Sequence, residues 1–298
     1  MKMQNMKRVL EAPVNVNSLR MQNFKRVLDA PAGVIVGILI VVTAIFLIFP
    51  VIVTTLMAFD SRAYFGPFPP PGLSTQWFSK LLTSDYIING FKTSVLIAVA
   101  ATVISTVVGT MAALSIVEMQ PGKRDLVTTL FLSPLVLPSV IIGFALLLVL
   151  SFTPIPAFWR ILLGHLIITI PYTVRMTLIG LAGINPSLRD AALSLGANER
   201  QALFSVTLPL AKNGIAAGAI FAFAYSMDDV AISMFASDYN TFTLPIALVS
   251  LIRSSFDLTV AAAAVFLMVL TLVLLLILDR VIGLEKVMGQ SLYRTEDK

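Results

Sequence analysis

The sequence predicts an all-α integral membrane protein with about six transmembrane helices, and two observations support this prediction. The 298 residues have a mean hydropathy of +0.91, with 57% hydrophobic and only 12% charged residues. A soluble domain carries roughly a quarter of its residues as charged side chains, so most of this surface must face lipid. In addition, six apolar runs have about the 17–25 residues that are needed to cross roughly 30 Å of hydrocarbon.

The six predicted spans run over residues 33–57, 93–117, 126–151, 161–184, 214–236 and 258–278. Lys and Arg side chains are about three times as frequent on one side of these spans as on the other, which places the richer side in the cytoplasm. Both termini therefore belong to the cytoplasm. The chain divides into a basic N-terminal segment (1–32), a six-helix transmembrane domain (33–284) and a cytoplasmic tail (285–298).

The N-terminal segment contains an internal repeat. Residues 3–13 recur with few changes as residues 21–31. A small tandem duplication, with Met21 as an alternative start, explains the repeat most simply. A basic helix lying on the inner membrane surface is the functional alternative.

Two outer loops depart from the apolar pattern. The first contains three successive prolines within residues 66–72, which cannot continue a helix, and it predicts an extended external segment. A short amphipathic helix is expected after it, near Trp77 to Leu82. The second loop, roughly residues 237–257, is less apolar than the spans and is expected to hold a short interfacial helix.

The cytoplasmic stretch 185–213 has the composition of a short helix, a break and a second helix. Pro186 suits a first helical turn, and Ala191, Ala192 and Leu195 form a small apolar face at helical spacing. Gly196 permits a tight turn, and Pro209 is expected to interrupt the following helix. A small-residue face on an exposed loop is suited to docking into a groove of a partner.

This stretch also carries a spaced pattern: an acid and two alanines, then a glycine, then an aliphatic residue shortly before Leu-Pro. The residues are Asp190, Ala191, Ala192, Gly196, Val206, Leu208 and Pro209. The pattern resembles the cytoplasmic signature of permease subunits of bacterial ABC importers, which is Glu-Ala-Ala, three residues, Gly, nine residues, Ile, one residue and Leu-Pro. Every spacing is kept, and only Asp190 and Val206 depart from it, both conservatively.

The resemblance implies a type I importer fold, a place in the bacterial inner membrane and a set of partners. In such permeases this loop is the coupling helix that sits in a cleft of a cytoplasmic ATPase. Two ATPases then drive two homologous permease subunits through alternating access, and a periplasmic binding protein delivers the solute. The chain lacks a Gly-x-x-x-x-Gly-Lys-Ser/Thr loop, so it needs no cofactor of its own, and ATP is expected on the partner subunits.

The fifth predicted span contains the adjacent acids Asp228 and Asp229, with Tyr225 and Ser226 just before them. Carboxylates in a membrane helix cost on the order of 3 kcal/mol each and normally face a bundle interior or a watery cavity. A cation site in the translocation pathway, an ion pair with a partner subunit and a capping role at a helix break all remain open. Adjacent helical residues point about 100° apart, so both acids cannot face one pathway equally.

The run Ser226-Met227-Asp228-Asp229 resembles the spermidine/putrescine branch of the importer family, and the resemblance covers most of the chain after about residue 30. It implies a polyamine as the solute and Tyr225, Ser226, Asp228 and Asp229 as pathway residues. Other nitrogen-containing solutes, such as opines or aminophosphonates, are the alternative within this class.

Other classes of protein fit less well. The chain has no cysteine and only one histidine, His165, which excludes thiolate chemistry and leaves a histidine metal site without ligands. His165 is expected to be a packed or hydrogen-bonded helix residue rather than a proton relay. A membrane-embedded enzyme lacks a catalytic constellation, and an ion-coupled secondary transporter would predict internal repeats of the spans. The net charge of +5 is assigned to cytoplasmic loops and not to nucleic-acid binding.

Overall fold

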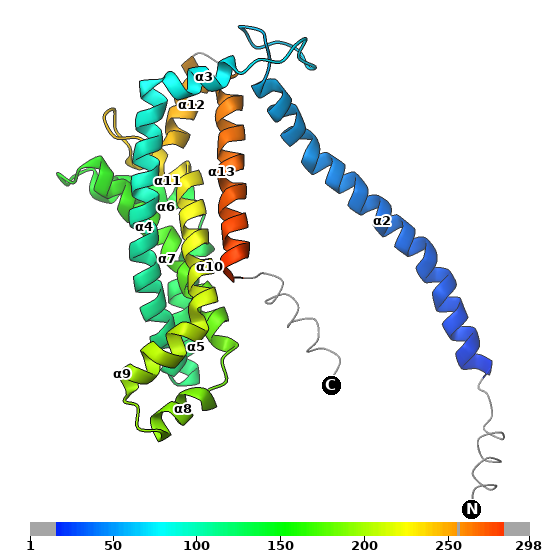
Figure 1. Ribbon diagram of the computed structural model, residues 1–298, viewed down its shortest axis with the longest axis vertical. Helices are drawn as coiled ribbons and strands as arrows, with labels where there is room; N and C mark the ends of the chain where they lie inside the picture. The colour runs from blue at the N-terminus through cyan, green and yellow to red at the C-terminus, as the bar shows by residue number, and fades with distance from the viewer. Residues whose placement is uncertain (1–15, 255–256, 283–298) are drawn as a thin grey trace, which may run out of the picture. The chain divides into compact units, whose positions relative to one another are not determined.

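The computed structural model describes residues 16–254 and 257–282, and helices are its main regular elements (Figure 1). Within these ranges the only β pairing is an isolated bridge between Asp60 and Leu73. The chain forms two compact units, residues 1–55 and 56–298. The predicted all-α fold is therefore confirmed for the described residues.

The first unit is built on one helix, α2 (Val16–Ala58). It contains the first predicted span, since Val34–Ala58 is long and apolar enough to cross a membrane. The second copy of the sequence repeat, residues 21–31, is part of this helix. The first copy (3–13) and the predicted tail (285–298) lie outside the described residues, so these assignments stay predictions.

The second unit contains eleven further α-helices among its described residues. They are α3 (Gln76–Thr83), α4 (Asp85–Glu118), α5 (Pro121–Leu132), α6 (Ser139–Leu150), α7 (Ala157–Ala182), α8 (Ser187–Ser194), α9 (Glu199–Ala202), α10 (Leu208–Asp228), α11 (Ala231–Ala236), α12 (Leu244–Ser254) and α13 (Thr259–Ile282). The short helices predicted in the two outer loops are confirmed as α3 and α12. The second, fourth and sixth predicted spans correspond to α4, α7 and α13.

The third predicted span is wrong as a single helix. It is divided into α5 and α6, whose axes differ by 89°. Pro134 and Pro138 lie between the two helices; Pro138 has an extended ψ of 128° and directly precedes α6. Proline lacks the N–H that would continue the ladder and displaces the preceding residue from helical geometry, which explains the bend.

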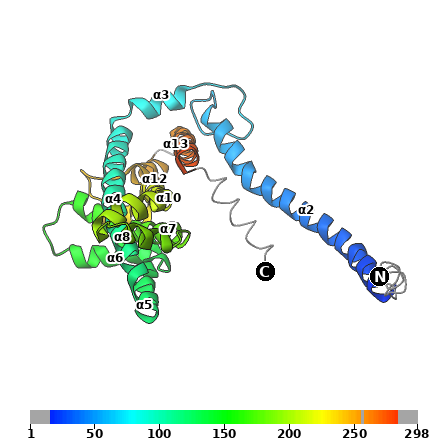
Figure 2. The same cartoon turned by 60° about the horizontal axis from the view of Figure 1, so that its bottom comes forward.

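Helices α4, α7 and α10 pack against one another at the centre of the second unit, as both views show (Figures 1 and 2). Helices α7 and α10 approach closely at Gly180 and Gly214, where a Cβ added to Gly214 would lie only 2.7 Å from the Met176 carbonyl oxygen. The Thr173 hydroxyl donates to the Ser105 carbonyl oxygen of α4 at 2.7 Å. Small residues and interhelical hydrogen bonds of this kind are typical of helix packing in membranes.

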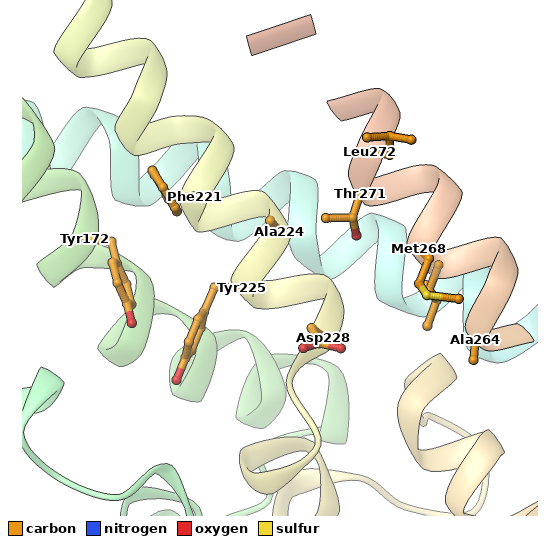
Figure 3. A pocket seen from close by; sticks show the side chains of 10 residues that line it. Tyr172, Phe221, Ala224, Tyr225, Asp228, Ala264, Met268, Thr271 and Leu272 are labelled. Carbon is orange, nitrogen blue, oxygen red and sulfur yellow. The ribbon is translucent and has the colours of Figure 1, made fainter. Parts of the chain in front are cut away.

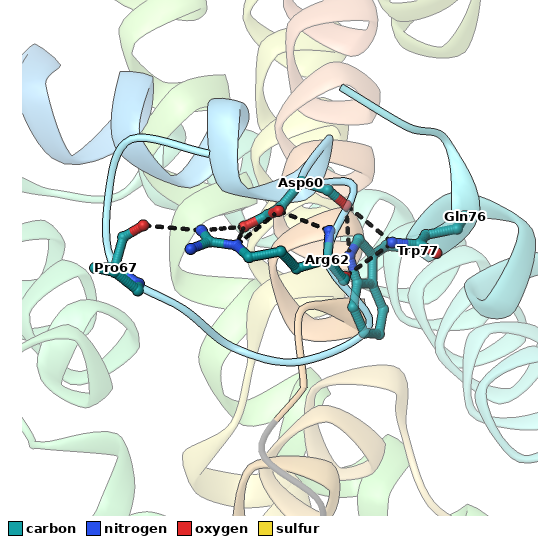
Figure 4. Close-up of polar contacts among 5 residues, drawn as sticks. All are labelled: Asp60, Arg62, Pro67, Gln76 and Trp77. Atoms are coloured by element: carbon teal, nitrogen blue, oxygen red, sulfur yellow. Dashed lines mark hydrogen bonds and ion pairs between the residues drawn. The ribbon is translucent and has the colours of Figure 1, made fainter. Parts of the chain in front are cut away.

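The outer loop before α3 is irregular, as its prolines predict, and it is organised by an ion pair (Figure 4). The buried Asp60 carboxylate accepts from the Arg62 guanidinium, and Arg62 also donates to the Pro67 carbonyl oxygen at 2.8 Å. The backbone oxygen of Asp60 accepts from Trp77 Nε1 at 3.0 Å and from Gln76 Nε2 at 3.1 Å. The ion pair therefore orders the loop, and the backbone oxygen of Asp60 fixes it to the start of α3.

This loop is expected to loosen in acid. Hydrogen bonds from the Arg62 side chain lower the pKa of Asp60 below its ordinary value of 3.8. The stabilising contribution of the pair is complete above that value and is lost as the pH falls below it. In a Trp159→Phe background, the fluorescence of Trp77 is expected to shift to the red reversibly in that range. In Asp60→Asn the emission should no longer follow this titration, and an emission maximum that stays constant in both proteins would contradict the assignment.

Candidate functional site

The cytoplasmic stretch forms the helix–break–helix that its composition predicts. Helix α8 ends at a glycine turn in which Gly196 has a φ of +92°, and the amide of Ala197 donates to the Ala192 carbonyl oxygen at 3.1 Å. Helix α9 then begins with a reciprocal capping box between Asn198 and Gln201. A positive φ favours glycine, which explains why the motif has a glycine at this position.

Three large apolar side chains of this loop are exposed on its surface. Leu188, Leu195 and Phe204 are 47%, 89% and 59% exposed, which is unusual for side chains of this size on a charged loop. Arg189 reaches Glu199 at 2.5 Å and Glu118, at the end of α4, at 3.4 Å. The loop is thus anchored to the bundle while its apolar side chains remain accessible.

The predicted motif residues are distributed over this loop and the start of α10. Asp190, Ala191, Gly196 and Pro209 are exposed, whereas Ala192, Val206 and Leu208 are half-buried. The expectation that Pro209 interrupts the helix is wrong, because the helical path runs from Glu199 to Asp228. The missing amide of Pro209 is instead accommodated by a π-helical turn over Leu203–Thr207 immediately before it.

The fifth predicted span is also wrong as a continuous helix, since α10 ends at Asp228 and α11 begins at Ala231. Asp229 has an extended ψ of 120°. One oxygen of its carboxylate accepts from the amides of Ile232 and Ser233 at 3.1 and 3.0 Å, and from the Ser233 hydroxyl at 3.2 Å. A carboxylate at the first turn of a helix satisfies amides that lack an intrahelical partner, which explains why the chain breaks here.

Asp229 belongs to a buried polar cluster that also includes His165 of α7. The Nδ1 atom of His165 lies 2.6 Å from the Ser226 hydroxyl, and its Nε2 atom lies 3.1 Å from the Ser233 hydroxyl. The Asp229 carboxylate lies 3.5 Å from Nε2. All four side chains are less than a tenth exposed. The expectation that His165 is a packed and hydrogen-bonded residue is confirmed.

Asp228 does not join this cluster and instead lines a cavity of about 720 Å³ (Figure 3). Phe221, Ala224, Tyr225 and Asp228 contribute the α10 wall, at spacings of three and four residues that share one helix face. Tyr172 of α7 lies beside Tyr225, with ring centroids 5.0 Å apart. The α13 wall consists of Ala264, Leu267, Met268, Thr271 and Leu272.

The structure therefore divides the four residues predicted for the pathway. Tyr225 and Asp228 face the cavity together, whereas Ser226 and Asp229 lie in the buried cluster on the other side of α10. The expected divergence of the two acids is thus observed. Tyr172 and the α13 wall were not predicted, because a tyrosine or an apolar side chain in a membrane span gives no signal that distinguishes a cavity wall from a packing contact.

Residues 105–283, more than half of the chain, match the model of a family described as the binding-protein-dependent transport system inner membrane component. The chain belongs to this family. The members of this family are transport components, so the protein is a multi-pass permease subunit of an import system and not an enzyme.

Individual permeases are similar over most of their length. The spermidine/putrescine transport system permease protein PotC of Escherichia coli K12 is 28% identical over 247 residues, which cover 83% of this chain and 92% of the relative. A putative 2-aminoethylphosphonate permease, PhnV of Salmonella typhimurium, is 27% identical over 234 residues, with 74% and 87% covered. A bacterial alginate ABC transporter structure superposes with a TM-score of 0.69 at 19% identity, covering 88% of this chain and 98% of the other, and shows the type I importer fold.

Proposed function

We propose that this permease subunit carries a small organic cation, most simply a polyamine such as spermidine or putrescine, into a bacterial cell. The observation that carries the proposal is the single carboxylate of Asp228 in a cavity with two tyrosine rings. A carboxylate offsets the lost hydration of an ammonium group, and aromatic faces attract cations within about 6 Å of the ring centroid. The methylene groups of a polyamine suit the apolar α13 wall.

The cavity chemistry favours a cation over a zwitterion. Among the described residues that line the cavity, none is Lys or Arg, so this wall offers no positive charge to a phosphonate or a carboxylate. A 2-aminoethylphosphonate, which the PhnV relative is named for, carries both charges. It remains the second candidate because the sequence identities of PhnV and PotC to this chain are similar, 27% and 28%.

The proposal includes partners. The exposed apolar side chains of residues 185–213, the coupling loop, are suited to docking on a cytoplasmic ABC ATPase. Two such ATPases would serve the two permeases of a pair. A second homologous permease completes the pathway, a periplasmic binding protein delivers the solute, and alternating access driven by ATP moves it across the inner membrane. An ion-coupled mechanism would instead require transport by this chain without ATPases.

A panel of solutes tests the proposal. The permease would be reconstituted in lipid vesicles with its partner permease, ATPases and binding protein, and ATP hydrolysis would be measured with spermidine, putrescine or 2-aminoethylphosphonate. We expect a polyamine to stimulate hydrolysis and uptake. Stimulation by the phosphonate alone would retain the importer and replace the solute, whereas uptake without ATPases would overturn the proposed energy source.

A further inference from the structure

The buried cluster around His165 connects three helices at the point where one of them breaks. His165 lies on α7, Ser226 lies on the last turn of α10, and Ser233 lies on α11. His165 has no exposed surface and does not line the cavity. One side chain on an unbroken helix thus holds both sides of the break.

The hydrogen bonds of the cluster assign a direction to the bond at His165 Nε2. Ser233 has a single hydroxyl hydrogen, which it donates to the Asp229 carboxylate. The Ser233 oxygen is then an acceptor for His165 Nε2–H, and Nδ1 forms a second hydrogen bond with the Ser226 hydroxyl. In this arrangement both ring nitrogens have a hydrogen-bond partner.

Apolar contacts also hold α11 against α7 beside His165. A Cβ added to Gly164, the residue before His165, would overlap the Ile232 side chain, and Ile232 also packs with Ile142 and Ile168. These contacts hold α11 close to α7, but apolar packing has no preferred direction along the surface. The two directional hydrogen bonds of His165 fix how the chain turns between Asp228 and Ala231.

We propose that His165 is a positioning residue that fixes the break after α10 and thereby keeps the Asp228 carboxylate turned into the cavity. It acts through Ser226 on one side of the break and Ser233 on the other, and it does not touch the solute. The inference rests on the proposed role of Asp228 in binding a cation, and the test below separates the two.

Two amide substitutions distinguish the two arms of the cluster. The amide of His165→Asn occupies the position of Nδ1, so it retains the contact with Ser226 and loses Ser233. The amide of His165→Gln reaches the position of Nε2 and retains the contact with Ser233. Thr169→Ala is the matched control, because it removes an equally buried hydroxyl of α7, which donates to the His165 carbonyl oxygen within the same helix.

The first readout is polyamine uptake by the complete reconstituted transporter. We expect His165→Asn to raise the KM roughly fivefold to tenfold, the change expected from losing one buried hydrogen bond, with Vmax per assembled complex little altered. His165→Gln, which loses the bond to Ser226 instead, should raise the KM by a similar factor, and Thr169→Ala should not change it. If His165→Asn and Thr169→Ala lower Vmax alike and leave KM unchanged, His165 is merely structural and the proposal is overturned.

The second readout does not depend on the solute. Because the chain contains no cysteine, Asp228→Cys provides a unique thiol at the cavity wall. Its labelling by a cationic methanethiosulfonate in the assembled transporter is expected to slow roughly fivefold to tenfold when His165→Asn is added, and to stay unchanged with Thr169→Ala. Equal rates in all three proteins would overturn the positioning role. A slowed rate together with polyamine uptake that Asp228→Asn does not affect would retain it and reject the cation site.

Discussion

Asp228→Asn is expected to raise the KM for polyamine uptake by roughly tenfold to a hundredfold. A charge-assisted hydrogen bond contributes about 1.5–3 kcal/mol, and the amide keeps the size of the side chain while removing the charge. The carboxylate lines the cavity beside Tyr225, and no other acid is among the described lining residues. The measurement is initial uptake of labelled spermidine or putrescine by reconstituted vesicles, normalised to assembled complex.

The adjacent acid provides a matched control for this effect. Asp229→Asn removes the same charge one residue away but retains an oxygen that can accept from the Ile232 and Ser233 amides. We therefore expect its KM to stay within about twofold of the wild type, because the cap is retained and no cavity contact is lost. A larger effect at Asp229 than at Asp228 would contradict the assignment of the cation to the cavity and would place it near the buried cluster instead. Equal and small effects would reduce both acids to structural roles.

The second large effect is expected at the glycine of the coupling loop. Gly196 has a φ of +92°, and an alanine in left-handed geometry costs about 1–2 kcal/mol. Gly196→Ala should therefore lower the equilibrium constant that favours the observed loop roughly tenfold, because 1.4 kcal/mol is a tenfold change in an equilibrium. Polyamine-stimulated ATP hydrolysis should fall by at most about that factor, whereas the KM for the solute should not change.

Gly183 offers the control, since it lies at the end of α7 with an ordinary φ of −80°. A Cβ at Gly183 would come no closer than 3.8 Å to the Gly180 carbonyl oxygen. Gly183→Ala is expected to retain stimulated hydrolysis. If both variants behaved alike, the loop geometry at Gly196 would not matter for coupling. A raised KM in Gly196→Ala would mean that the change reaches the cavity.

Hydropathy predicted where helices occur better than where they stop. Residues 93–117 fall within α4, and the predicted span 161–184 lies within α7 except for its last two residues, because both helices are long and apolar. The third and fifth spans failed for different reasons. Prolines bend the chain between α5 and α6, and hydropathy alone takes no account of them. The break at Asp229 depends on a carboxylate that caps α11, which is the capping role that the sequence left open beside two other roles.

The candidate site was predicted from its charges and not from its walls. Helical geometry predicted that Asp228 and Asp229 diverge, but not which one faces a cavity. That choice depends on His165, which lies far away in sequence and draws Ser226 and Asp229 to its side of α10. The pair of Asp60 and Arg62 was not predicted either, because an acid and a base two residues apart are common on any outer loop.

The continuous helical path from Glu199 to Asp228 has a mechanical consequence. At 1.5 Å per residue, these 30 residues form a lever about 45 Å long, with the coupling loop at one end and the cavity carboxylate at the other. A stiff lever transmits rotation as well as displacement. The angle between its two ends is therefore set by its length, since inserting one residue would turn Asp228 by about 100° relative to the loop.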